Sequence, residues 1–477
     1  MPKILSLPLL LAVALANPAQ ATVTMIAAGN LNLPADLSGL SAPLENGVAG
    51  NALGGLGSGL AWAGGNTFLG LPDRGPNATV YANGAAVDQT TSYIDRFQTL
   101  TLNLLQSSNN GTYSYGLSTS LTNTTLLYST TPLNYGSTAM LSSAVPAQNS
   151  NDKYYFTGRS DNFAAGNSLA ANNARLDPEG IRVSGDGKSV FISDEYGPYV
   201  RQFDRTTGAL IKTFALPDNL AAAKPASAGA DEISANTVGR VANKGMEGLA
   251  ITPDGKTLVG FMQSALLQDG GNNGRANRIV TVDIASGAVK QFAYDNLIGG
   301  KTYGSSEILA LNDHQFLVLE RDGKGLGDGS AAKIKQIWAI DLTGAADVSN
   351  LSGEAALVAK APTKKLFLDL KAALNSFGIA DTMIPSKLEG MAFGLDIFEN
   401  GELFHTLYVA NDNDFDVLDP LNTNQFFVFK FSDRDLLNLG LDAFQQQSIP
   451  EPGSLVMLLG GLGLMAGVRR RKPQTAA

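Results

Sequence analysis

The sequence predicts an all-β fold, a β-propeller of about six four-stranded blades. Two observations carry this prediction: a composition rich in glycine and poor in charge, and a hairpin pattern that recurs along the chain. Glycine occurs 52 times in 477 residues, and charged residues make up 16% of the chain, against about 25% in an average soluble domain. Many turns and few charges are typical of antiparallel sheets.

The clearest copy of the hairpin pattern spans residues 180–216. The runs "GIRVS", "SVFIS", "YVRQFD" and "LIKTFAL" alternate apolar residues with small or polar ones, and the turn sequences "GDGK" and "RTTGA" lie between them. Glycine in such turns supplies the positive φ that tight hairpins need. This segment therefore predicts four antiparallel strands.

Other segments repeat all or part of the same pattern. They are residues 248–293, 307–357 and 390–431, the opening hairpin in residues 58–75, and a looser sixth copy in residues 112–158. A single four-stranded blade cannot bury both of its faces, so repeated blades stack into a ring. The rival fold is a pair of two-layer β-sandwiches, which the repeat period disfavours.

The two ends of the chain predict sorting segments that lie outside the fold. Residues 1–21 combine one lysine, an apolar stretch and a small-residue cleavage site, which is typical of a signal peptide that signal peptidase removes. We assign residues 22–446 to the propeller. In residues 447–477, the apolar stretch 453–468 precedes the basic cluster 469–472. This order predicts a short membrane anchor whose basic end lies in the cytoplasm.

Charge and composition exclude several function classes. The formal net charge of −9 argues against a nucleic-acid surface, which would be basic. The chain has no cysteine, which excludes disulfides, thiolate nucleophiles and cysteine-ligated metals. It has only two histidines and no Gly-x-Ser-x-Gly motif, so a serine hydrolase of that type is not indicated either. Once thiolate and serine nucleophiles are excluded, metal-assisted hydrolysis is the hydrolytic chemistry that remains.

Glutamates recur at one position of the repeat. Just before or within the first strand stand Glu179, Glu247, Glu307 and Glu389, and the ends of second strands add Glu195 and Glu320. First strands line a propeller's channel, so we expect these carboxylates to converge at its mouth. Converging carboxylates need neutralisation, and an oxygen-only donor set favours Ca²⁺. The sequence thus predicts a calcium site. The alternative is that each glutamate only accepts backbone N–H bonds from the neighbouring blade.

Five motifs also carry a family resemblance, in residues 53–431. They are "GLGSGLAWAGGNTFLGLPDRGPNA", "LDPEGIRVSGDGKSVFISDEYG", "NKGMEGLAITPDGKTLVGFMQSALLQDGG", "SSEILALNDHQFLVLERD" and "KLEGMAF" with "LYVANDNDF". In this order they resemble the phytase-like domain family, also called esterase-like activity of phytase. The resemblance implies a propeller of about six blades and hydrolysis of phosphoesters or other esters. It implies no catalytic residues.

The C-terminal segment carries a second resemblance. Pro450-Glu451-Pro452, the apolar stretch and the arginine cluster resemble the PEP-CTERM sorting signal of Gram-negative bacteria. This resemblance implies processing by an exosortase-type transpeptidase, transient anchoring in the inner membrane, and delivery to the cell envelope or the extracellular matrix.

Two functions remain open on the sequence. In the first, the protein is a hydrolase in which a cation is held by the glutamates and Arg74, Arg159 and Arg321 bind the phosphate oxygens of a phosphoester in a bidentate manner. In the second, the propeller is a non-catalytic binding module of the cell envelope or of the exopolysaccharide matrix, because propellers serve both uses. A set of phosphate-binding cations beside the acids would favour the enzyme. A mouth closed by salt bridges would favour the binder.

Overall fold

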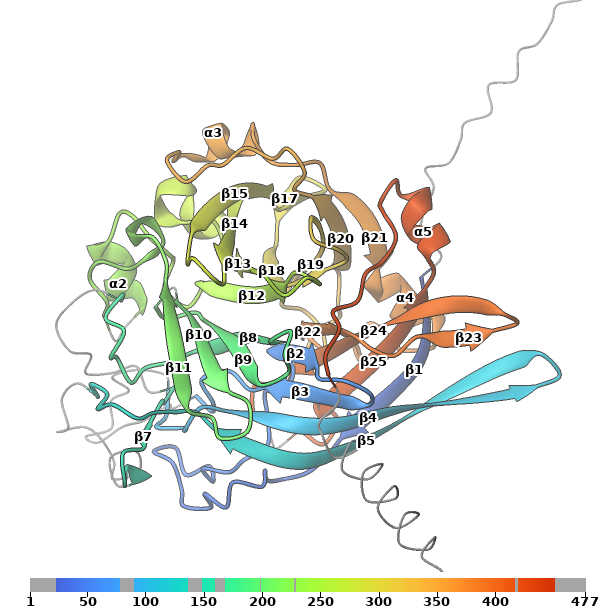
Figure 1. Ribbon diagram of the computed structural model, residues 1–477, viewed down its shortest axis with the longest axis horizontal. Helices are drawn as coiled ribbons and strands as arrows, with labels where there is room; N and C mark the ends of the chain where they lie inside the picture. Colours follow the sequence, from blue (N-terminus) through green and yellow to red (C-terminus); the bar gives the residue numbers. More distant parts are fainter. Residues whose placement is uncertain are drawn as a thin grey trace, which may run out of the picture.

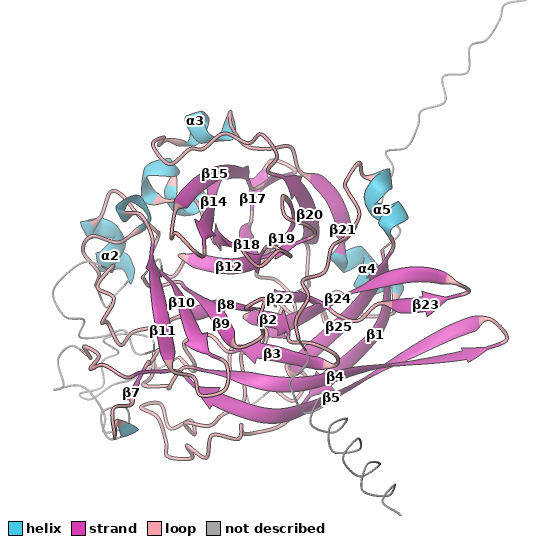
Figure 2. Ribbon diagram, in the orientation of Figure 1, coloured by secondary structure: helices cyan, strands magenta, loops and turns pink. Residues whose placement is uncertain are grey.

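The computed structural model is a β-propeller, as the sequence predicts. It describes residues 23–77, 90–135, 148–158, 168–197, 199–226, 229–416 and 419–450. Five antiparallel sheets stand around one axis (Figures 1 and 2). The number of blades is therefore five, where the sequence indicated about six.

The first four blades are each built from four consecutive strands, with the first strand innermost. Blade 1 contains β2 (Gly59–Trp62), β3 (Thr67–Leu71), β4 (Arg96–Asn109) and β5 (Thr112–Leu126), and blade 2 contains β8 (Pro178–Val183), β9 (Ser189–Asp194), β10 (Tyr199–Asp204) and β11 (Leu210–Ala215). Blade 3 contains β12 (Met246–Ile251), β13 (Thr257–Met262), β14 (Ala276–Asp283) and β15 (Val289–Asp295), and blade 4 contains β18 (Gly304–Ala310), β19 (Gln315–Arg321), β20 (Lys335–Asp341) and β21 (Lys365–Asp369).

Blade 5 closes the ring with strands from both ends of the chain. Its inner strands are β22 (Lys387–Phe393), β24 (Glu402–Asp412) and β25 (Asn424–Phe431), and β1 (Thr24–Leu31) pairs antiparallel with β25 as the outermost strand. The short β23 (Ile397–Glu399) pairs with β24. The N-terminal strand thus completes the blade that the C-terminal strands begin.

Within the segment 112–158, expected as a sixth blade, residues 112–126 belong to blade 1. These residues form β5, which pairs with β4 in a long hairpin whose tip reaches β23 (Figure 1). There, Gln106 Nε2 donates to the Phe398 carbonyl at 2.8 Å, and Asn400 N donates to the Tyr113 hydroxyl at 3.0 Å. Farther along, β6 (Tyr128–Ser129) and β7 (Tyr154–Tyr155) form only a two-stranded sheet.

The remaining elements are short. They are the pair β16 (Leu297–Ile298) and β17 (Lys301–Thr302), the helices α2 (Gly229–Ala235), α3 (Glu354–Val358), α4 (Leu370–Ser376) and α5 (Asp433–Asn438), and the 3₁₀ turns η3 (Asp218–Leu220), η4 (Leu267–Asp269) and η5 (Gly271–Asn273). No helix within the described ranges is both long and apolar enough to cross a bilayer. The expected signal peptide and the apolar stretch 453–468 lie outside the described residues.

The hydrophobic core is divided among the five interfaces between neighbouring blades. At the interface of blades 2 and 3, for example, Phe191 and Phe214 join Leu249 and Leu258 in one buried cluster, and the other four interfaces have clusters of the same kind. Burial of apolar surface stabilises each interface by about 25 cal/mol per Å². Every blade therefore depends on both of its neighbours for its buried faces.

The inner strands β2, β8, β12, β18 and β22 line the channel, and each contacts the next around the ring. All five run in the same direction along the axis, since the residues at their C-terminal ends line one common cavity. We call the face at their N-terminal ends the upper face and the opposite face the lower face.

Candidate functional site

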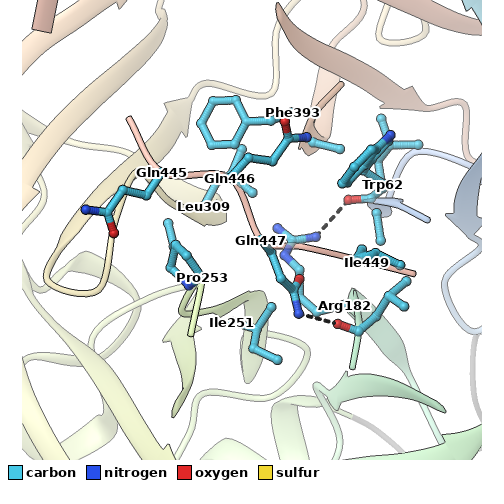
Figure 3. A pocket seen from close by; sticks show the side chains of 15 residues that line it. Trp62, Arg182, Ile251, Pro253, Leu309, Phe393, Gln445, Gln446, Gln447 and Ile449 are labelled. Atoms are coloured by element: carbon cyan, nitrogen blue, oxygen red, sulfur yellow. Dashed lines mark hydrogen bonds between the residues drawn. The ribbon is translucent and has the colours of Figure 1, made fainter. Parts of the chain in front are cut away.

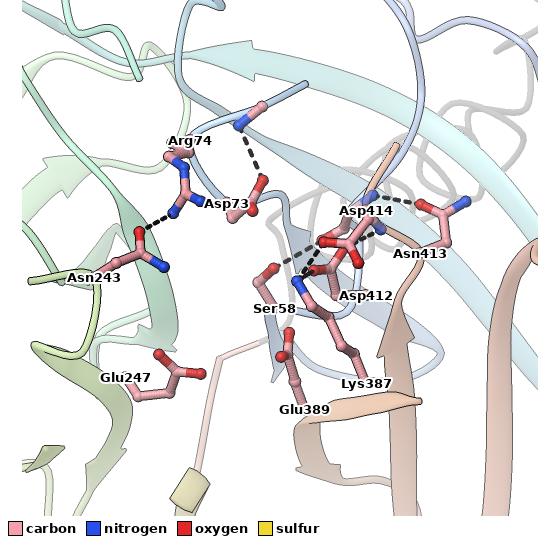
Figure 4. A network of polar contacts seen from close by, with 12 residues as sticks. Ser58, Asp73, Arg74, Asn243, Glu247, Lys387, Glu389, Asp412, Asn413 and Asp414 are labelled. Carbon is pink, nitrogen blue, oxygen red and sulfur yellow. Dashed lines mark hydrogen bonds and ion pairs between the residues drawn. The ribbon is translucent and has the colours of Figure 1, made fainter. Parts of the chain in front are cut away.

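Carboxylates gather at the centre of the upper face. We call this cluster the acidic mouth, and its members are Asp73, Asp177, Glu179, Glu195, Glu247, Glu389, Asp412 and Asp414 (Figure 4 shows part of it). All but Asp414, which keeps 46% of its side chain exposed, are buried. They come from blades 1, 2, 3 and 5, so no single blade forms the site.

Local backbone geometry explains why the Glu-Gly pairs recur. The pairing of each inner strand from β8 onward shifts register at or beside its glutamate, for example between Pro178 and Ile181 and between Met246 and Gly248. Such a bulge re-aims the side chain at the strand end. The glycine that follows allows the next blade to approach: a Cβ on Gly180 would lie 2.6 Å from Leu249 Cβ, and one on Gly248 would lie 2.8 Å from the Ile308 nitrogen.

Three carboxylates in blade 2 form the best candidate for a cation site. One oxygen each from Asp177, Glu179 and Glu195 lie within 4.8 Å of one another. Two oxygens that bind one Ca²⁺ at about 2.3–2.6 Å lie no more than about 5 Å apart, so the spacing suits this ion. Glu195 is 1% exposed, and neither of its carboxylate oxygens has a hydrogen-bond partner among the described residues. A buried carboxylate without a partner is costly, and a cation would satisfy it.

Glu195 is held in place by the close approach of blade 3. A Cβ on Gly245, just before β12, would lie 2.0 Å from the Glu195 carbonyl oxygen, so only glycine fits there. Asp194, next to Glu195, accepts from the backbone nitrogens of Asp177 and Tyr196 at 3.1 and 3.0 Å. These contacts hold the segment of Glu195 against the segment of Asp177 and Glu179.

Glu247 and Glu389 face the same space from blades 3 and 5 (Figure 4). One oxygen of Glu247 accepts from Gln263 Nε2 at 2.7 Å, and the other is buried with no hydrogen-bond partner in the part of the chain that the structure describes. Glu389 is ion-paired with Arg321. Glu247 is therefore the more available of the two for a ligand in the mouth.

Burial and mutual repulsion raise the pKa values of these acids. Burial raises the pKa of Glu247 to about 8, and the negative charge of Glu389 adds to the effect. Burial, followed by the charges of Glu247 and Asp177, raises the pKa values of Glu179 and Glu195 well above their ordinary range. Burial and Asp412 do the same for Asp73. Among the described residues of the mouth, the carboxylates thus outnumber the basic side chains that pair with them.

The basic residues of the mouth are already paired with carboxylates. Arg74 binds Asp177 through both its backbone nitrogen, at 3.1 Å, and its guanidinium, at 2.9 Å. Arg321 pairs with Glu389, and Lys387 pairs with Asp412 and Asp414. The side chains of Arg74, Arg321 and Lys387 keep 14%, 11% and 32% exposure, so the mouth opens to solvent. Arg159, the third arginine predicted to bind phosphate, lies outside the described residues.

Two predicted ligands lie away from the mouth. Glu320 contacts Lys364 and Tyr294 at the interface of blades 3 and 4. Glu307 accepts backbone N–H bonds from Ile308 and, in the neighbouring blade, from Leu249, at 2.9 and 3.1 Å. Glu307 therefore has the blade-register contacts that the sequence offered as the alternative to metal binding.

Arg182 blocks the channel below the acidic mouth. It is 4% exposed, donates to the carbonyls of Leu60, Ile181 and Ile308 at 2.7, 2.6 and 3.0 Å, and pairs with Glu307 at 2.9 Å. It thus connects the inner strands of blades 1, 2 and 4. These bonds cross the channel below the mouth.

Among the residues that shape this centre, the sequence patterns did not single out Asp177, Arg182 or Lys387. Asp177 shares a strand face with Glu179 because residues two apart in an extended chain point the same way, a signal that "LDPEG" carries. Arg182 is a charge within the otherwise apolar run "GIRVS", which is unusual for a buried strand. Lys387 lies two residues before Glu389, so the same two-residue spacing could have placed both side chains on one face of the strand.

At the lower face, next to Arg182, lies an apolar cavity of about 60 Å³ (Figure 3). Residues Trp62, Ile251, Leu309 and Phe393 line it, together with the C-terminal segment from Gln445 to Ile449. This cavity has no carboxylate among its lining residues.

Two family models match the chain. One is described as "Esterase-like activity of phytase" and matches residues 51–415, and the other is described as the PEP-CTERM protein-sorting motif and matches residues 448–472. Over 188 residues, the chain is 32% identical to an uncharacterized secreted protein of Arthroderma benhamiae. That match covers 33% of this chain and 36% of the relative, so the two are aligned over about a third of their lengths.

Solved structures with a similar arrangement are distant. The β-propeller domain of Cps50 (Swd1) from Myceliophteria thermophila is 8% identical, with a TM-score of 0.27 over 78% of this chain and 82% of that one. The periplasmic gluconolactonase PpgL of Pseudomonas aeruginosa is 10% identical, with a TM-score of 0.29 over 82% and 91%. Similarity at this level carries no information about the reaction.

Proposed function

The chain belongs to the family described as esterase-like activity of phytase, and from that premise we propose that it hydrolyses phosphoesters or other esters with a divalent cation held in the acidic mouth. The protein is exported and associated with the cell envelope, in keeping with its sorting motif and its secreted relative. The proposal includes processing by an exosortase-type enzyme at the inner membrane of a Gram-negative cell.

One observation carries the proposal: the carboxylate triad Asp177, Glu179 and Glu195 is buried, closely spaced and under-neutralised. The oxygen donors favour Ca²⁺, which accepts irregular coordination. When bound, such an ion stabilises charge on an ester or phosphoryl oxygen as a Lewis acid.

The chain's own residues have separate tasks in this proposal. The triad holds the cation, and Arg74 holds Asp177 in place. Glu247 has an oxygen without a partner among the described residues and faces the mouth, where it can accept a proton from a water molecule or from the substrate. Arg182 closes the channel below, so that substrate enters and leaves through the upper face.

One observation favours the second candidate, a cation-dependent binding module without catalysis. Arg74, Arg321 and Lys387 each have a carboxylate partner, so binding a phosphate would require them to exchange partners. A binding module that uses the cation itself to contact a polysaccharide or another anionic matrix component needs no such exchange.

The test combines calcium calorimetry with turnover of p-nitrophenyl phosphate and p-nitrophenyl acetate, each with and without chelator. We expect calcium binding and chelator-sensitive turnover in the wild type. Glu195→Gln should weaken calcium binding at least about tenfold, because the replacement removes one of three charged ligands. Glu320→Gln is the matched control, since it neutralises an equally buried glutamate outside the mouth.

The outcomes separate the candidates. Calcium binding without turnover of either ester would refute the hydrolase and support the non-catalytic binding module. An absence of calcium binding, or equal binding by Glu195→Gln and the wild type, would refute the cation site. Turnover that survives chelation would refute the proposed role of the cation in hydrolysis.

A further inference from the structure

The lower face of the propeller is closed by the chain's own C-terminal segment. We call residues 444–450 the strap. After α5, the chain crosses the face of the ring (Figure 1) and runs over the lower end of the channel (Figure 3). Gln445 N donates to the Leu311 carbonyl of blade 4 at 2.9 Å, and Gln446 Nε2 donates to the Gly394 carbonyl of blade 5 at 3.0 Å.

The strap continues to blades 2 and 1. Gln447 Nε2 donates to the Val183 carbonyl of blade 2 at 3.1 Å. Ile449 is 8% exposed and belongs to the hydrophobic cluster between blades 1 and 2. At the other end, Phe444 packs against the rings of Phe393 and His405, at centroid distances of 4.4 and 4.6 Å. The strap is thus fixed at both ends and in the middle.

The sorting motif begins within this fixed segment. The match to the motif starts at residue 448, so the buried Ile449 is both a core residue of the propeller and part of the motif. The Pro-Glu-Pro sequence follows at once, starting at Pro450. Hence no loose linker lies between the folded ring and the start of the motif, and the tail leaves from the lower face.

We propose that the lower face is turned toward the lipid surface that holds the sorting tail, and that the acidic mouth faces away from that surface. The two ends of an inner strand fix the geometry. From Glu179 at the upper end of β8 to Val183 at the lower end, the strand spans about 13 Å at about 3.3 Å per residue. The blades lie between the lipid surface and the mouth, and the mouth is open to soluble or matrix-bound ligands. This orientation holds whatever chemistry the mouth performs.

The test uses cysteine labelling of residues 22–477, which lack the expected signal peptide and contain no native cysteine. Single cysteines replace exposed lysines: Lys188 in the β8–β9 turn and Lys256 in the β12–β13 turn, both on the lower face, and Lys324, beyond the upper end of β19. The protein is reconstituted into phosphatidylethanolamine–phosphatidylglycerol vesicles, collected by flotation and treated with a 5 kDa polyethylene glycol maleimide.

We expect Lys324→Cys to react at least about five times faster than Lys188→Cys and Lys256→Cys on vesicles, and the three to react at similar rates in detergent. Adding Ile449→Asp, which releases the strap from its apolar site, should make the three rates similar on vesicles too, while circular dichroism verifies the fold. Equal rates on vesicles without this change would overturn the orientation. If the protein does not float with the vesicles, the proposal that its lower face lies on a lipid surface is wrong.

Discussion

At the scale of single residues, the most informative feature is the excess of buried acid. Glu179, Glu195 and Glu247 have pKa values raised first by burial and then by one another. The folded protein therefore retains protons that the unfolded chain releases. In the absence of a cation, deprotonation of these groups works against folding.

This linkage predicts how stability depends on pH. Glu247 has an ordinary pKa of 4.5 and a folded value of about 8. Between these values the native state binds more protons than the unfolded state, so in chelator the melting temperature should fall by several degrees as pH rises from 5 to 8. Calcium binds the deprotonated acids, so it should raise the melting temperature more at pH 8 than at pH 5. Thermal unfolding followed by circular dichroism measures both effects.

The control for this prediction is Glu247→Gln, which removes one titrating group and should flatten the fall in chelator. A melting temperature that rises from pH 5 to pH 8 in chelator would contradict the assignment. So would a calcium effect that is the same at both pH values.

The position of the glutamates in the repeat predicted some residues of the acidic mouth but not all of them. The common offset of Glu179, Glu247 and Glu389 located the mouth, because equivalent strand ends meet on one face of the ring. The same offset in Glu307 leads to a different position, because its carboxylate binds Arg182 and the Leu249 nitrogen. The position of a residue within the repeat determines how far along the channel axis it lies. Its side-chain partner, however, comes from the neighbouring blade, and a short window of sequence contains no information about that blade.

At the scale of elements, the inner strands are joined across the channel by the Arg182–Glu307 ion pair. The side chains of Arg182 and Glu307 are 5% and 0% exposed. A buried ion pair is not strongly stabilising in itself, but removal of one partner leaves the other charge buried and unpaired.

A double-mutant cycle tests this role. Glu307→Gln should destabilise the protein by about 3–5 kcal/mol, because the Arg182 charge loses its counter-ion. Arg182→Met with Glu307→Gln should be less damaging than the sum of the single changes. Urea unfolding gives the free energies. Additive effects would show that the pair does not act as a unit.

Hairpins were the most predictable elements, for a physical reason. Alternation of apolar residues and glycine-containing turns are both local, so β8–β9, β12–β13 and β18–β19 follow from short windows of sequence. The segment 112–158 was misassigned because "LLYST" and "KYYFTG" also look like strands. In the structure β5 instead pairs with the extended β4, so blade 1 has its fourth strand before residue 128.

At the scale of the whole molecule, β1 joins the N-terminal end of the chain to the C-terminal blade. β1 pairs with β25 from Thr24–Lys430 to Leu31–Asn424 and packs on blade 5. Each interface cluster needs two blades, so an open ring would expose the faces at its gap.

Deletion of residues 24–31 should therefore reduce the stability of the entire propeller. We expect a lower and broader thermal transition and at least about tenfold weaker calcium binding, although β1 lies at the outer edge of blade 5 and contributes no residue to the mouth. Differential scanning calorimetry and calcium titration measure these effects. Loss of the fold in blade 5 alone, with calcium affinity intact, would contradict cooperative closure.

The pairing of β1 with β25 also has a consequence for how the protein reaches its folded state. The Asn424 side chain donates to the Leu31 carbonyl across 393 positions of sequence. Contacts of such high order form late and slowly, because a long loop must close before they contribute. During export, the N-terminal strand emerges first and must wait for the last strands to cross. In the interval between the two, an unpaired strand edge is exposed to aggregation.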